Sequence, residues 1–232
     1  MANATTCISF ATTFIAAIAA LGLFFYWPVY FQASKGVGTV KSAIDFFGVA
    51  FIVAPCAMLA GGTISATQVY KPHNVIAWVL MSLGPGLLSL VKIDSSKAMW
   101  VALYRPPLRG HHLPRARAPP AVVAGQALAF IVFVPNFGNV LGITVGSTAL
   151  TNTLAKKLPA GFIAQLPGGV ASTYSAIPSI GALAEPLQTQ VRPAFAESMR
   201  VIWLVLIPFG GVGLLFAVFM RQIELETVTD KT

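Results

Sequence analysis

The chain has 232 residues, of which 56% are hydrophobic and 9% charged, and its formal net charge is +8. Soluble domains carry roughly 25% charged residues, so this composition excludes an ordinary soluble protein and indicates several membrane spans. The positive charge does not indicate a nucleic-acid-binding protein, because it is partly concentrated in the stretch 105–120 and otherwise scattered over loops.

The first long apolar run, 8–31, has no charged residue and is long enough to cross the ~30 Å hydrocarbon layer. It ends in the aromatic stretch Phe24–Phe31, and Tyr and Trp favour the depth at which a span meets the headgroups. We therefore predict a span whose aromatic end forms an interface belt. Within it, Phe25 and Tyr26 are candidates for the wall of a substrate cavity, since drug pockets are mostly apolar and aromatic.

A second span is predicted at 44–68 and a third at 74–91, with a tight turn at 70–73 between them. Asp45 stands at the mouth of the second span. An acid at this position is a candidate for proton coupling, and a helix cap or an interfacial acid is the alternative interpretation.

The segment 98–118 begins as a fourth span, but its composition then changes. Residues 105–120 read RPPLRGHHLPRARAPP, and such a run of arginine and proline does not fit a helix interior in lipid. Two interpretations remain for this stretch: an artefact of the reading frame or gene model, and a real basic linker.

The fifth predicted span, 127–150, combines small and polar residues. Gly138, Gly142 and Gly146 recur every four residues and predict a ridge for close helix packing. Asn136 and Asn139 lie one turn apart on a common face. These two side chains either line a substrate cavity or bond neighbouring helices to each other.

The C-terminal part of the chain begins with a polar loop, 156–199, whose later part has the periodicity of a short interfacial helix. A sixth span follows at 201–220, and a polar tail at 222–232 ends the chain. Residues 1–221 therefore form a single transmembrane helical domain. The predicted fold class is an all-α membrane protein, a bundle of about five to six transmembrane helices.

The sequence lacks the motifs of common enzymes: no Gly-x-Ser-x-Gly elbow, no His-Glu-x-x-His and no phosphate loop is present. We expect no catalytic residue, no metal site and no cofactor. A pore or scaffold would be expected to repeat a polar stripe through several spans, and only the fifth span shows one.

Six stretches of the chain resemble the fourteen-helix drug:proton antiporters of fungi, in the major facilitator superfamily (MFS). In chain order they are YWPVYFQASKG, SAIDFF, YKP, DSSKAMW, ALAFIVFVPNFGNVLGITVGSTALTN and AIPSIGALAEPLQTQVRPAFAESM. The resemblance is to the C-terminal half of such a transporter and covers nearly the whole chain except 105–125. Where the family has an apolar, Gly-rich helix, this chain has the basic segment.

This resemblance implies a multi-pass protein that exports small hydrophobic compounds or toxins, driven by proton entry and by rocking of two helical halves. The implied partners are the lipid bilayer, a hydrophobic small molecule and protons, with no nucleic acid. The implied location is the plasma membrane, with the vacuolar membrane as the alternative. Asp45 matches the family's acidic position at the head of the second span.

The family's N-terminal half has no counterpart in this sequence, so we expect that the chain does not transport alone. Self-association of two copies is one way to close the open cavity wall. The alternatives to a transporter half are a non-transporting membrane scaffold or assembly partner, and a non-functional truncated product.

The frame-artefact interpretation makes a prediction about the transcript. A full-length read should continue upstream of the codon for Met1 into further apolar spans, and should encode an apolar, Gly-rich helix in place of 105–120. A transcript that begins at Met1 and keeps the basic segment would contradict this interpretation.

Overall fold

The computed structural model describes residues 2–90, 121–164, 166, 168–169 and 173–220. Within these ranges every regular element is a helix and none is a strand, which confirms the all-α class. The elements are α1 (Ala2–Ala33), α2 (Thr39–Thr67), α3 (Lys71–Ser89), α5 (Ala121–Lys157), α6 (Ala160–Ile163), α7 (Thr173–Ala176), the 3-10 helix η2 (Ile177–Ala182) and α8 (Leu187–Phe219).

Three of these helices contain segments long and apolar enough to cross a membrane, by length and composition: Thr6–Ala33, Ala129–Lys157 and Leu187–Phe219. Helices α2 and α3 lie along the second and third predicted spans. The segment 98–118, its basic part 105–120 and the tail 222–232 lie outside the described residues.

The largest difference from the predicted elements concerns α8. The sequence predicted a short interfacial helix followed by a separate sixth span, whereas the structure has one continuous helix, Leu187–Phe219. Its buried face continues at helical spacing across the expected break, through Phe195, Met199 and Ile202, while Arg200 is exposed. The helix continues because the same apolar face stays packed on the bundle along its length.

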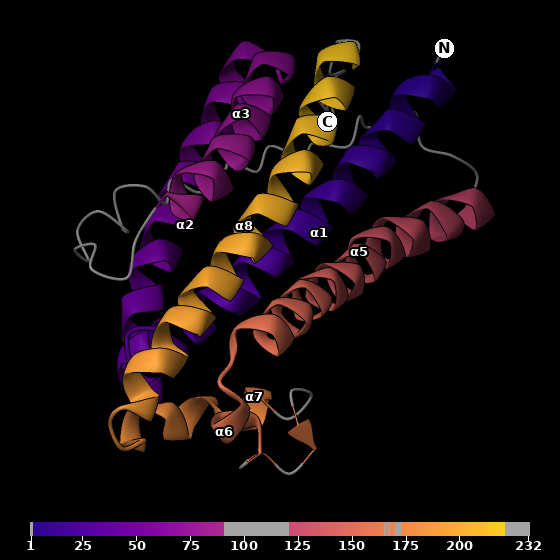
Figure 1. The fold of residues 1–232 in the computed structure, drawn as a ribbon. Helices are drawn as coiled ribbons and strands as arrows, with labels where there is room; N and C mark the ends of the chain where they lie inside the picture. Colours follow the sequence, from indigo (N-terminus) through magenta and orange to yellow (C-terminus); the bar gives the residue numbers. More distant parts are fainter. Residues whose placement is uncertain (1, 91–120, 165, 167, 170–172, 221–232) are drawn as a thin grey trace.

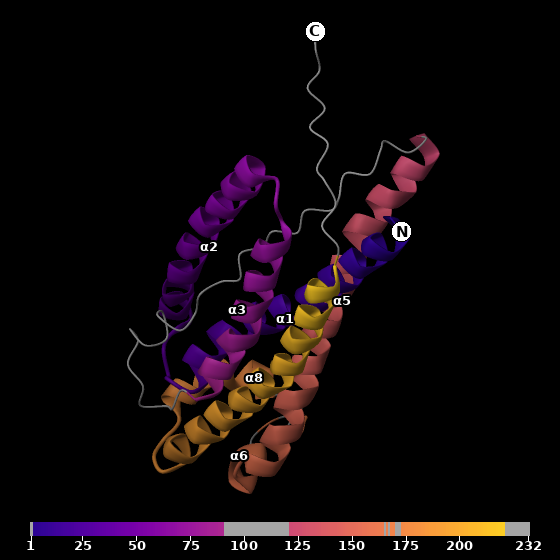
Figure 2. The ribbon, with the colours of Figure 1, turned by 90° about the horizontal axis from the view of Figure 1, so that it is seen from above.

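Helices α1 and α8 run side by side through the middle of the bundle (Figure 1). Helix α5 packs against both of them, and α3 packs along α8. Helix α2 makes its main contacts with α1, and a second view shows it beside α3, away from α5 (Figure 2). The short helices α6, α7 and η2 lie at the end of the bundle where α8 begins (Figure 1).

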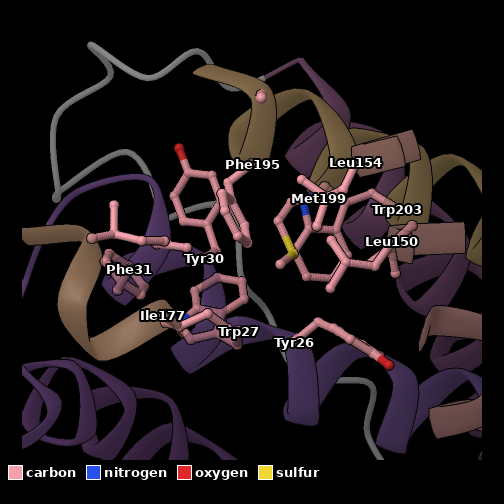
Figure 3. Packing of buried hydrophobic residues seen from close by; sticks show 14 of the residues in the cluster. Tyr26, Trp27, Tyr30, Phe31, Leu150, Leu154, Ile177, Phe195, Met199 and Trp203 are labelled. Carbon is pink, nitrogen blue, oxygen red and sulfur yellow. The ribbon is translucent and has the colours of Figure 1, made fainter. Parts of the chain in front are cut away.

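The aromatic end of α1 forms the centre of the main hydrophobic core. Tyr26, Trp27, Tyr30 and Phe31 are at most 4% exposed, and they lie among side chains of α5, α8 and η2 (Figure 3). The prediction of an interface belt is therefore wrong for these four side chains, which face other helices. The sequence signal was ambiguous because large aromatic residues suit a packed core as well as the headgroup region.

Close helix contacts depend on glycine at two places. In α5, a methyl group added at Gly138 would lie 2.7 Å from the backbone oxygen of Phe14, and one added at Gly142 would overlap the backbone of Ile18. In α8, a methyl group at Gly210 would lie 2.7 Å from Ser82 Oγ of α3. The first contact joins α1 to α5, and the second, which sequence reasoning missed, joins α3 to α8.

The α1–α5 contact predicts opposite effects for two alanine substitutions. Gly142→Ala should lower the free energy of unfolding by roughly 1–3 kcal/mol, because the new methyl group meets backbone atoms that cannot move aside easily. Gly211→Ala is the control, since nothing lies within 4 Å of its added methyl group. It should be neutral or stabilising by up to about 1 kcal/mol, the difference in helix propensity. Thermal unfolding in detergent compares the two variants, and equal shifts would contradict the predicted contact.

Candidate functional site

Tyr26 links α1 to α5. Its hydroxyl donates a hydrogen bond to the backbone oxygen of Ile143 at 2.8 Å, and its ring lies where a side chain at Gly146 would be. The side chain is 0% exposed. In this arrangement Tyr26 holds two helices together and does not face an open cavity.

Phe25, the neighbouring cavity candidate, has a different environment. It is 42% exposed, and its ring contacts Tyr26 at a centroid distance of 5.2 Å and Tyr174 at 6.3 Å. One edge of the ring is thus held by aromatic contacts while the rest is open. Of the two aromatic candidates for a cavity wall, Phe25 is therefore the accessible one.

Tyr174 of α7 is a residue that sequence reasoning missed. It lies in the connection before α8, where no periodicity marks a buried position, and its ring contacts Phe25 and Tyr26, in each case at 6.3 Å. Burial raises the pKa of the Tyr174 phenol above its usual value. The phenol therefore stays protonated at physiological pH and packs as a neutral side chain.

The two asparagines of α5 lie at different depths. Asn136 is exposed and its Nδ2 donates to the backbone oxygen of Val132 in the same helix at 2.7 Å, while Asn139 is half-buried. Asn136 is seven residues before Ile143, the partner of Tyr26, so about 10 Å separates these levels along α5. The structure thus does not bring Asn136 beside Tyr26.

Phenylalanine side chains surround the level of Asn136. The rings of Phe133 and Phe137 stack at 5.7 Å with 9° between their planes, and Phe137 also stacks on Phe14 of α1 at 6.0 Å. Phe133 is 59% exposed and Phe137 49%. An exposed amide beside stacked aromatic rings resembles the lining of a small-molecule pocket.

Asp45 is half-buried and lies within α2, not at its end. The N-cap of α2 is Gly38, so the alternative interpretation of Asp45 as a helix cap is wrong. The next residue, Phe46, contacts Phe24 of α1 edge-on at 5.9 Å. Phe24 thus marks the level of Asp45 along α1, and Phe14, which contacts Phe137, marks the level of Asn136. Ten residues of helix separate Phe14 from Phe24, so the acid and the amide are about 15 Å apart along the bundle axis.

No group of three or more potential metal ligands occurs among the residues that the structure describes. His73, at the start of α3, contacts Thr63 Oγ1 of α2 through Nε2 at 3.0 Å. This contact joins the ends of two helices. His111 and His112 lie outside the described ranges.

The comparisons with known proteins find relatives among fungal transporters. The MFS transporter L2 of Phoma sp. is 28% identical over 98% of this chain, which corresponds to 40% of that protein. The efflux pump FUS6 of Gibberella moniliformis is 28% identical over 97% of the chain and 42% of its own length. The MFS-type efflux pump MMF1 of Pseudozyma antarctica is also 28% identical, over 97% of the chain and 43% of its own length.

Along nearly its whole length the chain is similar to MFS-type transporters and efflux pumps of fungi. It spans about 40% of the length of the curated relatives it matches, which fits the predicted resemblance to one half of such a transporter. No family profile and no solved structure matches the chain. With these relatives, the membrane helical bundle and the integral-membrane location are confirmed.

The Tyr26 contact predicts a small, specific loss of stability. Tyr26→Phe should lower the free energy of unfolding by roughly 0.5–1.5 kcal/mol, because it removes the hydrogen bond to Ile143 and keeps the ring. Phe25→Leu is the control, since it changes a neighbouring, partly exposed ring that makes no such bond in the described structure. Chemical unfolding in mixed micelles measures both variants. An unchanged midpoint for Tyr26→Phe would contradict the proposed link between α1 and α5.

Proposed function

We propose that this chain forms one helical half of a proton-coupled efflux transporter for small hydrophobic compounds, in the fungal plasma membrane. One observation carries the proposal: proteins named as transporters and efflux pumps match 94–98% of the chain, while the chain spans about 40% of each. A half of this kind contributes one wall of a cavity, and the second half contributes the other.

The packing of α5 supports this role. One side of the helix is packed on α1 and α8, and the side that carries Asn136 is exposed. Asn136, Asn139 and Phe25 are the residues we propose for contact with the transported compound. Their chemistry, two amides and an aromatic ring, suits a hydrophobic compound with a few polar groups.

Asp45 is the residue we propose for proton coupling. It lies in α2 at the edge of the apolar part, and an ionisable group at a membrane span is retained at a cost in desolvation. A carboxylate that binds and releases a proton as the two halves rock would couple proton entry to export. Its distance from Asn136 implies that the coupling acts through helix movement, without direct contact between the carboxyl group and the transported compound.

A complementation experiment tests the half-transporter proposal. The chain is expressed in a fungal host that lacks its own export pumps, alone and together with the part of the Phoma MFS transporter L2 that this chain does not match. Export of a hydrophobic dye should appear only with both parts and should stop when a protonophore collapses the gradient. Gradient-dependent export by this chain alone would contradict the need for a second half. Absence of export in every combination would contradict the transport function.

Replacing the acid tests the proton-coupling proposal in the same cells. Asp45→Asn should reduce gradient-driven export by at least about tenfold, because the amide cannot bind and release a proton. Glu185→Gln is the control. This acid is exposed, precedes α8 and accepts a hydrogen bond from the backbone N–H of Thr189. It should export like the unchanged chain. Equal export by both variants would show that Asp45 does not couple protons.

A further inference from the structure

The exposed side of α5 carries a row of residues at four-residue spacing, four of the five polar. The polar row, as we name it, consists of Asn136, Val140, Thr144, Thr148 and Asn152. All five are exposed. From the first to the last, the row extends for about 24 Å along the helix, most of the ~30 Å hydrocarbon layer.

The polar row lies opposite the packed face of α5. The buried positions Gly138, Gly142, Gly146 and Leu150 also recur every four residues, but two residues out of step with the row. Two residues correspond to about 200° around an α-helix, so one row faces the bundle and the other faces away from it. The close contact with α1 therefore fixes the direction of the polar row.

The hydrogen bonds in the polar row distinguish its threonines from its asparagines. Thr144 and Thr148 each donate a hydroxyl hydrogen to the backbone oxygen four residues earlier, at 2.9 Å. Such bonds make threonine tolerable even against lipid. Asn136 uses one N–H in its bond to Val132, which leaves a second N–H and an acceptor oxygen, and lipid offers no partner for them.

The asparagine side chains are thus more stable in contact with water than in contact with lipid, and an asparagine stands at each end of the row. We propose that the polar row lines a water-accessible path along α5, and that the path accepts neutral amphipathic compounds bearing hydrogen-bond donors. This inference rests on the proposed efflux function and adds a location and a substrate class to it.

The substrate class follows from what the row and its surroundings present. The threonine hydroxyls have already donated their hydrogens, so their oxygens remain as acceptors for hydroxyl or amine donors of a ligand. The stacked rings of Phe133 and Phe137 provide an exposed aromatic surface beside Asn136. From 129 to 155 the sequence of α5 contains no charged residue, so nothing on this helix compensates the desolvation of a cationic ligand.

Cysteine labelling tests whether the polar row meets water. The native Cys7 and Cys56 are first replaced by alanine, and the full chain then receives Thr144→Cys, Thr148→Cys or Leu204→Cys, one at a time. Leu204 of α8 is the control: it is 45% exposed and apolar. Leu204 lies at a similar depth in the bundle to Thr144. Leu206, half a turn further along α8, packs at Gly22 of α1, and the backbone oxygen of Gly142 lies beside the same glycine.

The probe is a sulfonated maleimide that does not cross membranes, applied to intact and to permeabilised cells. The thiolate is the reacting form, and each unit by which an apolar environment raises a thiol pKa lowers the reaction rate about tenfold. Both threonine positions should react at least about tenfold faster than Leu204→Cys. Equally slow labelling at all three positions would place the row against lipid and overturn the proposal.

Protection from labelling tests the substrate class. Naphthol, a neutral aromatic compound with one hydroxyl donor, should slow labelling at Thr144→Cys, whereas tetraphenylphosphonium, an aromatic cation without a donor, should not. Equal protection by both compounds, or by neither, would overturn the assignment to neutral donor-bearing compounds.

The labelling result and the export result are independent of each other. Fast labelling of the row without export in the complementation experiment would leave the water-accessible path and remove the efflux function. Export with slow labelling would leave the efflux function and remove the path along α5.

Discussion

The close contact between α1 and α5 determines how the rest of the bundle is arranged. Glycine at two positions of α5, Gly138 and Gly142, lets this helix approach the backbone of α1 closely, and a third, Gly146, leaves room for the ring of Tyr26. Membrane helices gain little from hydrophobic burial against each other, since lipid is equally apolar, so this steric fit supplies much of their association. The hydrogen bond from Tyr26 to Ile143 fixes the rotation of one helix relative to the other.

Once this rotation is fixed, it determines which face of α5 enters the core and which face points away from the bundle. The continuation of the glycine row, Leu150 and Leu154, enters the core beside Met199 and Trp203 of α8 (Figure 3). The opposite row of α5 points away from the bundle, and four of its five residues are polar. The same helix thus serves packing on one side and, in our proposal, contact with water and ligand on the other.

Sequence reasoning predicted the helical class, the positions of the long helices and the regular spacing of the α5 glycines. It predicted these features because apolar runs and i, i+4 patterns are local properties of the chain. It failed at the aromatic end of α1 and at the start of α8, where the environment is set by distant segments. Whether Trp27 meets headgroups or a protein core depends on where η2 and α8 fold back, and no local pattern carries that information.

The candidate site shows the same division. Asn136 was found from its unusual position in an apolar span, and Gly142 from its spacing. Tyr174 was missed because its role depends on a contact with Tyr26 across more than a hundred residues. The second glycine contact, Gly210 of α8 against Ser82 of α3, was missed because the pairing of two helices is not visible in either sequence alone.

The composition of a purified complex is the most direct test of the central claim, that this chain is one half of a transporter. The chain is tagged and purified in mild detergent from cells that also make the unmatched part of the Phoma relative, and the mass of the particle is measured. We predict one copy of the chain bound to one copy of that part. A chain that purifies free of it, as a monomer or as a complex of identical copies, would contradict the claim.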